Sequence, residues 1–378
     1  MNPSRRSRLR FLIRATQSAK LLFVVAVTAP LVAYADGDRA NSYVQHNLVS
    51  DGFVAADHTD HNLVNAWGVA FNPTAFVWVA DNGTGLSTLY DGLGNAQSLV
   101  VKIPGPKNSD TGTPTGIVFN ATNDFAVTNG TTSGTARFIF ATEDGVIAGW
   151  APNVDPTNAL RAVVHANTVY KSITLASNGT ANFLYAADFH GAKIDVYDRT
   201  FQLVHMPGGF HDRFIPKGFA PFNIQNIQGD LYVTFAKQDD QKHDEVDAPG
   251  LGVVDVFDSN GNLIRRIGTG GKLNAPWGLA LAPAEFGKFG NRLLVGNFGD
   301  GAILAFDPHS GTYLGRLHKP DGHVLKIDGL WGIAFGNGVL SQPTGTLFFA
   351  AGPDGENHGL YGTVKPAQGG VDSDDDSD

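Results

Sequence analysis

The 378-residue chain contains no cysteine, no apolar run long enough to cross a membrane, and little helical periodicity. Without cysteine there is no disulfide, so stability has to come from a large packed core. The net charge is −9 and no basic cluster follows the first 20 residues, which argues against nucleic acid or an anionic membrane as a partner. Nucleophile elbows, phosphate loops, dinucleotide fingerprints and helical zinc motifs are also missing from the sequence.

The first 35 residues are predicted to be an export signal outside the fold. A short apolar run at 21–27 precedes Ala-Tyr-Ala at 33–35, the small-x-small pattern that a signal peptidase recognises. The run is far shorter than the roughly 20 residues of a membrane-spanning helix. Basic residues come before it: Arg5, Arg6, Arg8, Arg10, Arg14 and Lys20. We therefore expect an exported protein, periplasmic or extracellular, that reaches its compartment by the general or the twin-arginine route.

Residues 36–366 are predicted to form one domain, followed by an acidic tail at 367–378. Aspartates dominate that tail and it has almost no apolar residue, so we expect it to be solvated and disordered, or alternatively to collect Ca²⁺ loosely. Between leader and tail, short runs of Val, Ile, Phe and Tyr alternate with Gly, Asn, Asp and Pro. This pattern predicts many short strands joined by tight turns.

An internal repeat organises these strands. Asn-Ala-Trp-Gly-Val-Ala-Phe at 65–71 recurs as Ala-Pro-Trp-Gly-Leu-Ala-Leu at 275–281 and as Gly-Leu-Trp-Gly-Ile-Ala-Phe at 329–335. Weaker copies begin at 113, 171 and 221. The equivalent positions are Gly68, Gly116, Ser172, Asn223, Gly278 and Gly332. These positions define six units with a near-constant period of roughly 50 residues, which indicates a repeat architecture.

Each repeat continues with three further strands. A second strand ends in a polar residue, a third in aspartate, and a tight turn leads into a fourth, as in 253–267. Four antiparallel strands per repeat make a propeller blade. The last repeat lacks a fourth strand, and residues 43–49 can supply it and remove a free sheet edge. We therefore predict an all-β, six-bladed β-propeller that is closed by its N-terminal strand.

The repeated tryptophans Trp67, Trp277 and Trp331 have two interpretations. If side chains alternate strictly along the strand, Trp67, Val69 and Phe71 lie on one face of the blade, with small residues on the other. Packing between neighbouring blades is then the expected role. The alternative is an aromatic ring at the mouth of the central channel that stacks on a flat ligand such as a sugar.

Candidate ligand-binding residues stand at the ends of the predicted second strands and in the turns that follow: Asp81, Asn129, Asp188, Asn297 and His190. The default role of Asp and Asn here is to hydrogen-bond the backbone of the turn. The functional alternative is a ring of oxygens on one face that accepts a divalent cation or a polar ligand. Second-to-third-strand turns share a face of a propeller, so we expect these residues, with His358, to lie on the same side. No cofactor other than such a cation is expected.

Three segments, 47–52, 62–70 and 79–85, resemble a conserved family of exported bacterial propellers, some of which end in a PEP-CTERM sorting tail. Nearly the whole chain after the leader shares the resemblance, although the acidic end lacks the apolar segment of the sorted members. The repeats are more distantly similar to NHL-type propellers and to gluconolactonase-type lactonases. That second likeness implies metal ligands just before the inner-strand glycine. The chain has Trp67, Thr115, Trp277 and Trp331 there, so the lactonase mechanism is not expected.

Two functions remain open at this point. The first is a non-catalytic exported binding or scaffold propeller, a monomer, whose partner is an extracellular protein, glycan or small molecule. The second is a hydrolase or lyase that uses a metal or an acid at a channel mouth. An enzyme should bring acid or His side chains together at one mouth, whereas a scaffold should show scattered polar groups and an exposed apolar rim.

Overall fold

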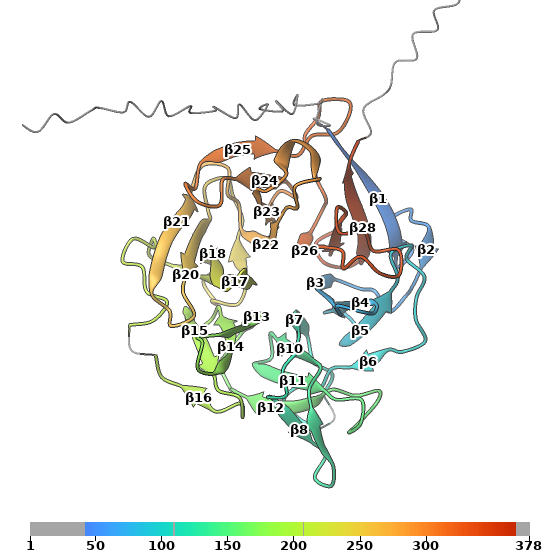
Figure 1. Cartoon of the computed structure of the whole chain (residues 1–378), viewed down its shortest axis with the longest axis vertical. Coiled ribbons are helices and arrows are strands. Elements are labelled where there is room, and N and C mark those ends of the chain that lie inside the picture. Colours follow the sequence, from blue (N-terminus) through green and yellow to red (C-terminus); the bar gives the residue numbers. More distant parts are fainter. Residues whose placement is uncertain (1–41, 109, 207, 368–378) are drawn as a thin grey trace, which may run out of the picture. The chain divides into compact units, whose positions relative to one another are not determined.

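The computed structural model describes residues 42–108, 110–206 and 208–367. The predicted leader at 1–35 and positions 368–378 of the predicted tail lie outside the described residues. Strands dominate, and six antiparallel sheets follow one another around a central axis, as Figure 1 shows. Within the described ranges, no helix is long and apolar enough to span a membrane.

The first three blades are built in chain order from the inside outward. Blade 1 contains β3 (Ala66–Phe71), β4 (Val77–Asp81), β5 (Leu86–Tyr90) and β6 (Val101–Lys102). Blade 2 contains β7 (Pro114–Phe119), β10 (Phe138–Thr142), β11 (Val146–Trp150) and β12 (Leu160–Val164), with the hairpin β8 (Ala126–Thr128) and β9 (Ser133–Thr135) inserted after β7. Blade 3 contains β13 (Tyr170–Ser177), β14 (Asn182–Asp188), β15 (Lys193–Tyr197) and β16 (Leu203–Val204).

The next two blades follow the same order. Blade 4 contains β17 (Phe219–Ile227), β18 (Asp230–Gln238), β20 (Val253–Phe257) and β21 (Leu263–Thr269), and the short β19 (Glu245–Val246) pairs with the end of β18. Blade 5 contains β22 (Pro276–Leu281), β23 (Leu293–Asn297), β24 (Ile303–Phe306) and β25 (Tyr313–Arg316), with the 3-10 turn η1 (Gly287–Phe289) between β22 and β23.

Blade 6 closes the ring with strands from both ends of the described chain. It contains β26 (Leu330–Phe335), β27 (Leu347–Ala351) and β28 (Leu360–Pro366), and β1 (Tyr43–Ser50) pairs with β28 in antiparallel register (Figure 1). The predicted fold and its closure are confirmed. β1 is not the outermost strand, however, because β2 (His58–Thr59) pairs with it in parallel on the outer side.

Apolar side chains pack in the interfaces between blades, as expected for sheets that bury both faces. Between blades 6 and 1, for example, Val77, Val79 and Tyr90 pack with Phe348 and Tyr361. At the axis, each inner strand contacts the next, and β26 returns to β3. The repeated glycine makes this approach possible, because a Cβ on Gly68 would lie 2.5 Å from the backbone oxygen of Thr115 in blade 2.

Every innermost strand carries a one-residue β-bulge at the same place. On β22 the register passes from Pro276 to Gly278, so Trp277 is the extra residue, and β13 has its shift at Lys171. β3, β7, β17 and β26 shift at the corresponding positions. A bulge re-aims the side chain it carries. The strict alternation assumed from the sequence therefore fails at the residue before each equivalent glycine position.

Candidate functional site at the channel mouth

The residues at the bulges fill the centre of the ring. Trp67, Trp277 and Trp331 are at most 5% exposed and contact one another, and the rings of Trp67 and Trp331 stack with centroids 3.7 Å apart. Phe222 and Phe298 pack on Trp331. These side chains come from blades 1, 4, 5 and 6, so their contacts lie at the axis. The tryptophans are buried, as the packing interpretation expects, but they pack against each other across the channel.

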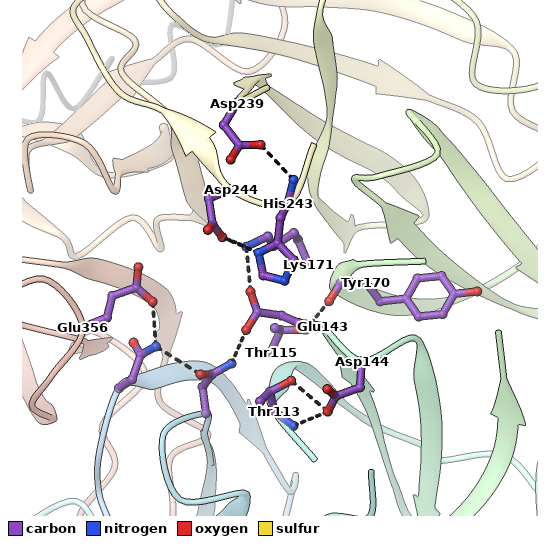
Figure 2. Close-up of polar contacts among 12 residues, drawn as sticks. Thr113, Thr115, Glu143, Asp144, Tyr170, Lys171, Asp239, His243, Asp244 and Glu356 are labelled. Carbon is purple, nitrogen blue, oxygen red and sulfur yellow. Dashed lines mark hydrogen bonds and ion pairs between the residues drawn. The ribbon is translucent and has the colours of Figure 1, made fainter. Parts of the chain in front are cut away.

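Two blades depart from this apolar pattern, because the bulge residue is Thr115 in blade 2 and Lys171, at the start of β13, in blade 3. Only Lys171 is charged. The side chain is 1% exposed, and its Nζ donates to Glu143 at 2.7 Å and to Asp244 at 3.1 Å. Glu143 lies in the β10–β11 turn of blade 2, and Asp244 lies in the loop after β18 in blade 4. Figure 2 shows these carboxylates converging on the ammonium.

Hydrogen bonds extend the site to blades 1 and 6. Asn82 Nδ2 donates to Glu143 at 2.8 Å, and Asn65 Nδ2 donates to Glu356 at 2.7 Å and to Asn82 at 3.3 Å. Trp331 Nε1 donates to Asn65 Oδ1, and this bond joins the polar network to the tryptophans that fill the channel. Asn65 has a φ of 46°, a left-handed conformation that asparagine tolerates better than most residues. We refer to Glu143, Lys171, His243, Asp244, Glu245 and Glu356 as the channel-mouth cluster.

The charges of this cluster perturb one another. Burial alone would lower the pKa of Lys171, but Glu143, Glu245 and Asp244 outweigh it and raise that pKa. Burial raises the pKa of Glu245 to about 7, against the opposing effect of Lys171, and burial also raises the pKa of Glu356. The pKa of Asp244 is lowered, because Lys171 and His243 outweigh its own desolvation. The pKa values of two adjacent carboxyl groups, those of Asp244 and Glu245, are thus shifted in opposite directions.

The cluster contains donors that suit a cation. Glu143, His243 and Asp244 each offer one ligand atom, and these atoms lie within 4.8 Å of one another. Carboxylate oxygens suit Ca²⁺ and Mg²⁺, and the imidazole adds affinity for Zn²⁺. The ammonium of Lys171 already bonds two of the three residues, so an entering cation has to displace it or bind at their outer oxygens.

The structure brings none of the five predicted site residues into the cluster. Among the described residues, no hydrogen bond or ion pair joins any of them to a cluster member. Asp188 Oδ1 accepts the backbone N–H of Gly191 at 2.9 Å, and Asn297 Nδ2 donates to the carbonyl of Lys272. The Asp188 bond matches the turn chemistry expected from the sequence, whereas the Asn297 side chain bonds the backbone of the segment that precedes β22. The carbonyl of His190 accepts a bond from Gln238 in the same region.

Asp81 and Asn129 differ from the expected arrangement. Asp81 ends β4 as predicted but is fully buried beside Thr88, and this burial raises its pKa well above the usual value. Asn129 is exposed in the turn of the inserted β8–β9 hairpin, so its prediction as the end of a blade's second strand is wrong. The second strand of blade 2 is β10, and the residue after it is Glu143.

Glu143 was missed because the inserted hairpin shifted the alignment of blade 2, and the other cluster residues were missed because they lie in different blades. One signal was present in the sequence: Lys171 precedes an equivalent glycine position that Trp or Phe precedes in four of the other repeats. A lysine at such a buried apolar position needs carboxylate partners. The sequence alone does not say which carboxylates these are.

Comparisons with known proteins agree with the propeller fold. No family model matches the chain. Uncharacterized protein L690 of Acanthamoeba polyphaga mimivirus is 34% identical over 325 residues, which cover 84% of each chain. Uncharacterized protein R648 of the same virus is 34% identical over 330 residues, 84% of this chain and 78% of the relative. Among solved structures, a streptogramin B lyase matches with a TM-score of 0.51 at 13% identity, covering 86% of this chain and 97% of the lyase. That likeness supports the fold alone.

Proposed function

The chain belongs to the family of the mimivirus proteins L690 and R648, and we propose that it is a binding propeller that takes a cationic ligand at the channel-mouth cluster. One observation carries the proposal. Carboxylates from blades 2, 4 and 6 converge on a single buried ammonium at one end of the channel. Convergent polar groups with perturbed pKa values in one place are typical of functional sites.

The charge balance favours a cation over an anion. The cluster contains four carboxyl groups against one lysine and one histidine, so negative charge is in excess even when Glu245 is half protonated. Side chains of Asp244 and His243 are 62% and 49% exposed, so the outer side of the cluster is open to solvent. A divalent metal ion or a small organic polyamine would meet carboxylate oxygens there.

Titration with Ca²⁺, Mg²⁺, Zn²⁺ and spermidine tests the proposal. A ligand of the folded state raises the melting temperature with its concentration. We expect at least one of the four to do so, and Glu143→Gln to abolish the rise while Asp188→Asn leaves it unchanged. The reverse result would instead place the site in the ring of strand-end residues at Asp188 and its equivalents. No rise with any of the four would overturn the proposal.

A second candidate function is acid–base catalysis, which the opposite pKa shifts of Asp244 and Glu245 favour. Neighbouring groups whose pKa values are pushed apart can divide the roles of base and acid at neutral pH. A hydrolase or lyase of this kind should act on small esters or lactones and lose activity in Glu245→Gln. Equal turnover by the wild type and Glu245→Gln would remove this candidate.

We further propose that the chain is exported as a monomer and binds an extracellular protein, glycan or small molecule. The basic leader, the Ala-Tyr-Ala pattern and the resemblance to exported bacterial propellers support the export. N-terminal sequencing of the secreted protein tests it, with Asp36 as the expected first residue. Retention of Met1 in a form that stays inside the cell would contradict export.

A further inference from the structure

A second concave site lies on the face opposite the channel-mouth cluster. A pocket of ≈ 650 Å³ opens between blades 1 and 2, where the β3–β4 loop meets the ends of β7 and β11. This volume falls in the range of small-molecule sites, about 300–1,000 Å³. Its principal walls are Phe76, Trp78, Leu99, Phe119, Arg137 and Trp150. We refer to it as the rim pocket.

The aromatic floor of the rim pocket is held in place by packing beneath it. The ring of Trp78 stacks on Phe138 with centroids 4.0 Å apart and contacts Trp150 at 4.7 Å. Trp78 and Phe138 are at most 3% exposed, so neither can turn away without opening the core. Trp150 Nε1 donates to the carbonyl of Pro156, which leaves its ring face apolar toward the pocket. The site is therefore preformed and suits a flat apolar group.

One charged side chain lies in this apolar wall. The guanidinium of Arg137 donates a single hydrogen bond, to the carbonyl of Thr122, and it makes no ion pair with any residue in the described part of the chain. Arginine has five N–H donors, so most of them remain available. A guanidinium at the edge of an aromatic pocket matches a carboxylate or sulfonate in charge and in geometry.

The longest first-to-second-strand connection of the propeller borders the same pocket. Residues on both sides of the inserted β8–β9 hairpin, Phe119 and Arg137, line it, and the hairpin projects from blade 2 in Figure 1. Insertions in repeat proteins often map to the binding face. From these observations we propose that the rim pocket binds a small amphipathic anion, with its apolar part on the partly exposed Phe76, Leu99 and Phe119 and its acid group on Arg137.

A matched pair of fluorescent probes tests the charge requirement. 8-Anilinonaphthalene-1-sulfonate carries an anion on the same ring system as the neutral N-phenyl-1-naphthylamine. We expect the sulfonate to bind the wild type with one-to-one stoichiometry. Arg137→Gln should weaken its affinity by about tenfold, the effect of losing one charge-assisted contact, and change that of the neutral probe by less than about twofold. Arg137→Lys should restore part of the affinity.

Two further variants locate the binding and control for global effects. Ala121 is exposed at the pocket, so Ala121→Trp should fill it without disturbing the core and abolish binding of both probes. Arg316→Gln removes a half-buried arginine of blade 5 and should leave both affinities unchanged. The proposal fails if Arg137→Gln affects the two probes equally or not at all, or if Ala121→Trp leaves sulfonate binding intact.

Discussion

Lys171 Nζ lies 5.1 Å from the ring centroid of Trp67, so the buried ammonium stands between an aromatic layer and an acidic rim. The ring of Phe189 lies on another side, at 5.9 Å. On one side of the ammonium, indole and phenyl rings fill the channel. On the other side, toward the channel mouth, it bonds the carboxylates of Glu143 and Asp244. Cation–π contacts and charge-assisted hydrogen bonds therefore hold the same atom.

Removal of this ammonium should destabilise the protein. Lys171→Met leaves Glu143 and Asp244 without their cation, and breaking a mostly buried pair costs about 2–4 kcal/mol after allowance for the exposure of Asp244. Urea unfolding measures the difference. Lys326→Met is the control, because the Lys326 side chain is 55% exposed and its Nζ lies 3.9 Å from Asp300, and the substitution should cost less than about 1 kcal/mol. Equal effects of the two substitutions would contradict the interpretation of Lys171.

The tryptophans of the channel should be structural. Trp331 is fully buried and contacts Trp67, Trp277, Phe222 and Phe298, so Trp331→Ala should cost about 3–5 kcal/mol. Trp331→Phe keeps part of the ring and should cost less. Thermal and urea unfolding of both variants decide the matter. A small loss for Trp331→Ala would indicate an open channel that the ring merely lines.

Stability should depend on pH through Glu245. Its pKa rises from 4.5 to about 7 on folding, so between these values the folded state binds more protons than the unfolded state. The stabilising contribution is therefore present below about pH 4.5 and is lost as the pH rises through about 7. Relative to wild type, Glu245→Gln should gain about 1–3 kcal/mol in free energy of unfolding between pH 4.5 and pH 8. Unfolding curves across this range test it, and a difference that does not change with pH would contradict it.

Closure of the ring should depend on β1. A variant without residues 36–50 loses the β1–β28 pairing and exposes the edge of β28, so it should melt at a lower temperature and aggregate. A milder variant is Tyr43→Phe, because the Tyr43 hydroxyl donates to the carbonyl of Phe286 and accepts the N–H of Phe289. Loss of both bonds should cost about 1–2 kcal/mol. Removal of 368–378 is the control and should leave the melting temperature unchanged. An unchanged melting temperature without 36–50 would contradict the closure argument.

The sequence by itself determined the propeller. Strand-forming runs, turn residues and the repeated Trp-Gly pattern are local signals, and they predicted the six blades and the exchange of 43–49 into the last one. That exchange is favoured because, without a fourth strand, the last blade would expose an edge with unpaired backbone N–H and C=O groups. The turn role of Asp188 was likewise predicted, since a side chain that bonds the backbone of its own turn depends on nearby positions only.

Only the tertiary structure decided the site. The bulge that turns Trp67, Lys171 and Trp277 toward the axis is a shift in the pairing register between two strands. The alternation of apolar and small residues along one strand does not predict such a shift. Lys171, Glu143 and Asp244 lie in three different blades, and the nature of their contact depends on how the ring closes. The inserted hairpin also concealed β10, which led the prediction to Asn129 instead of Glu143. Local chemistry specifies each blade, whereas the electrostatics of the channel mouth arise from distances between blades that no single repeat contains.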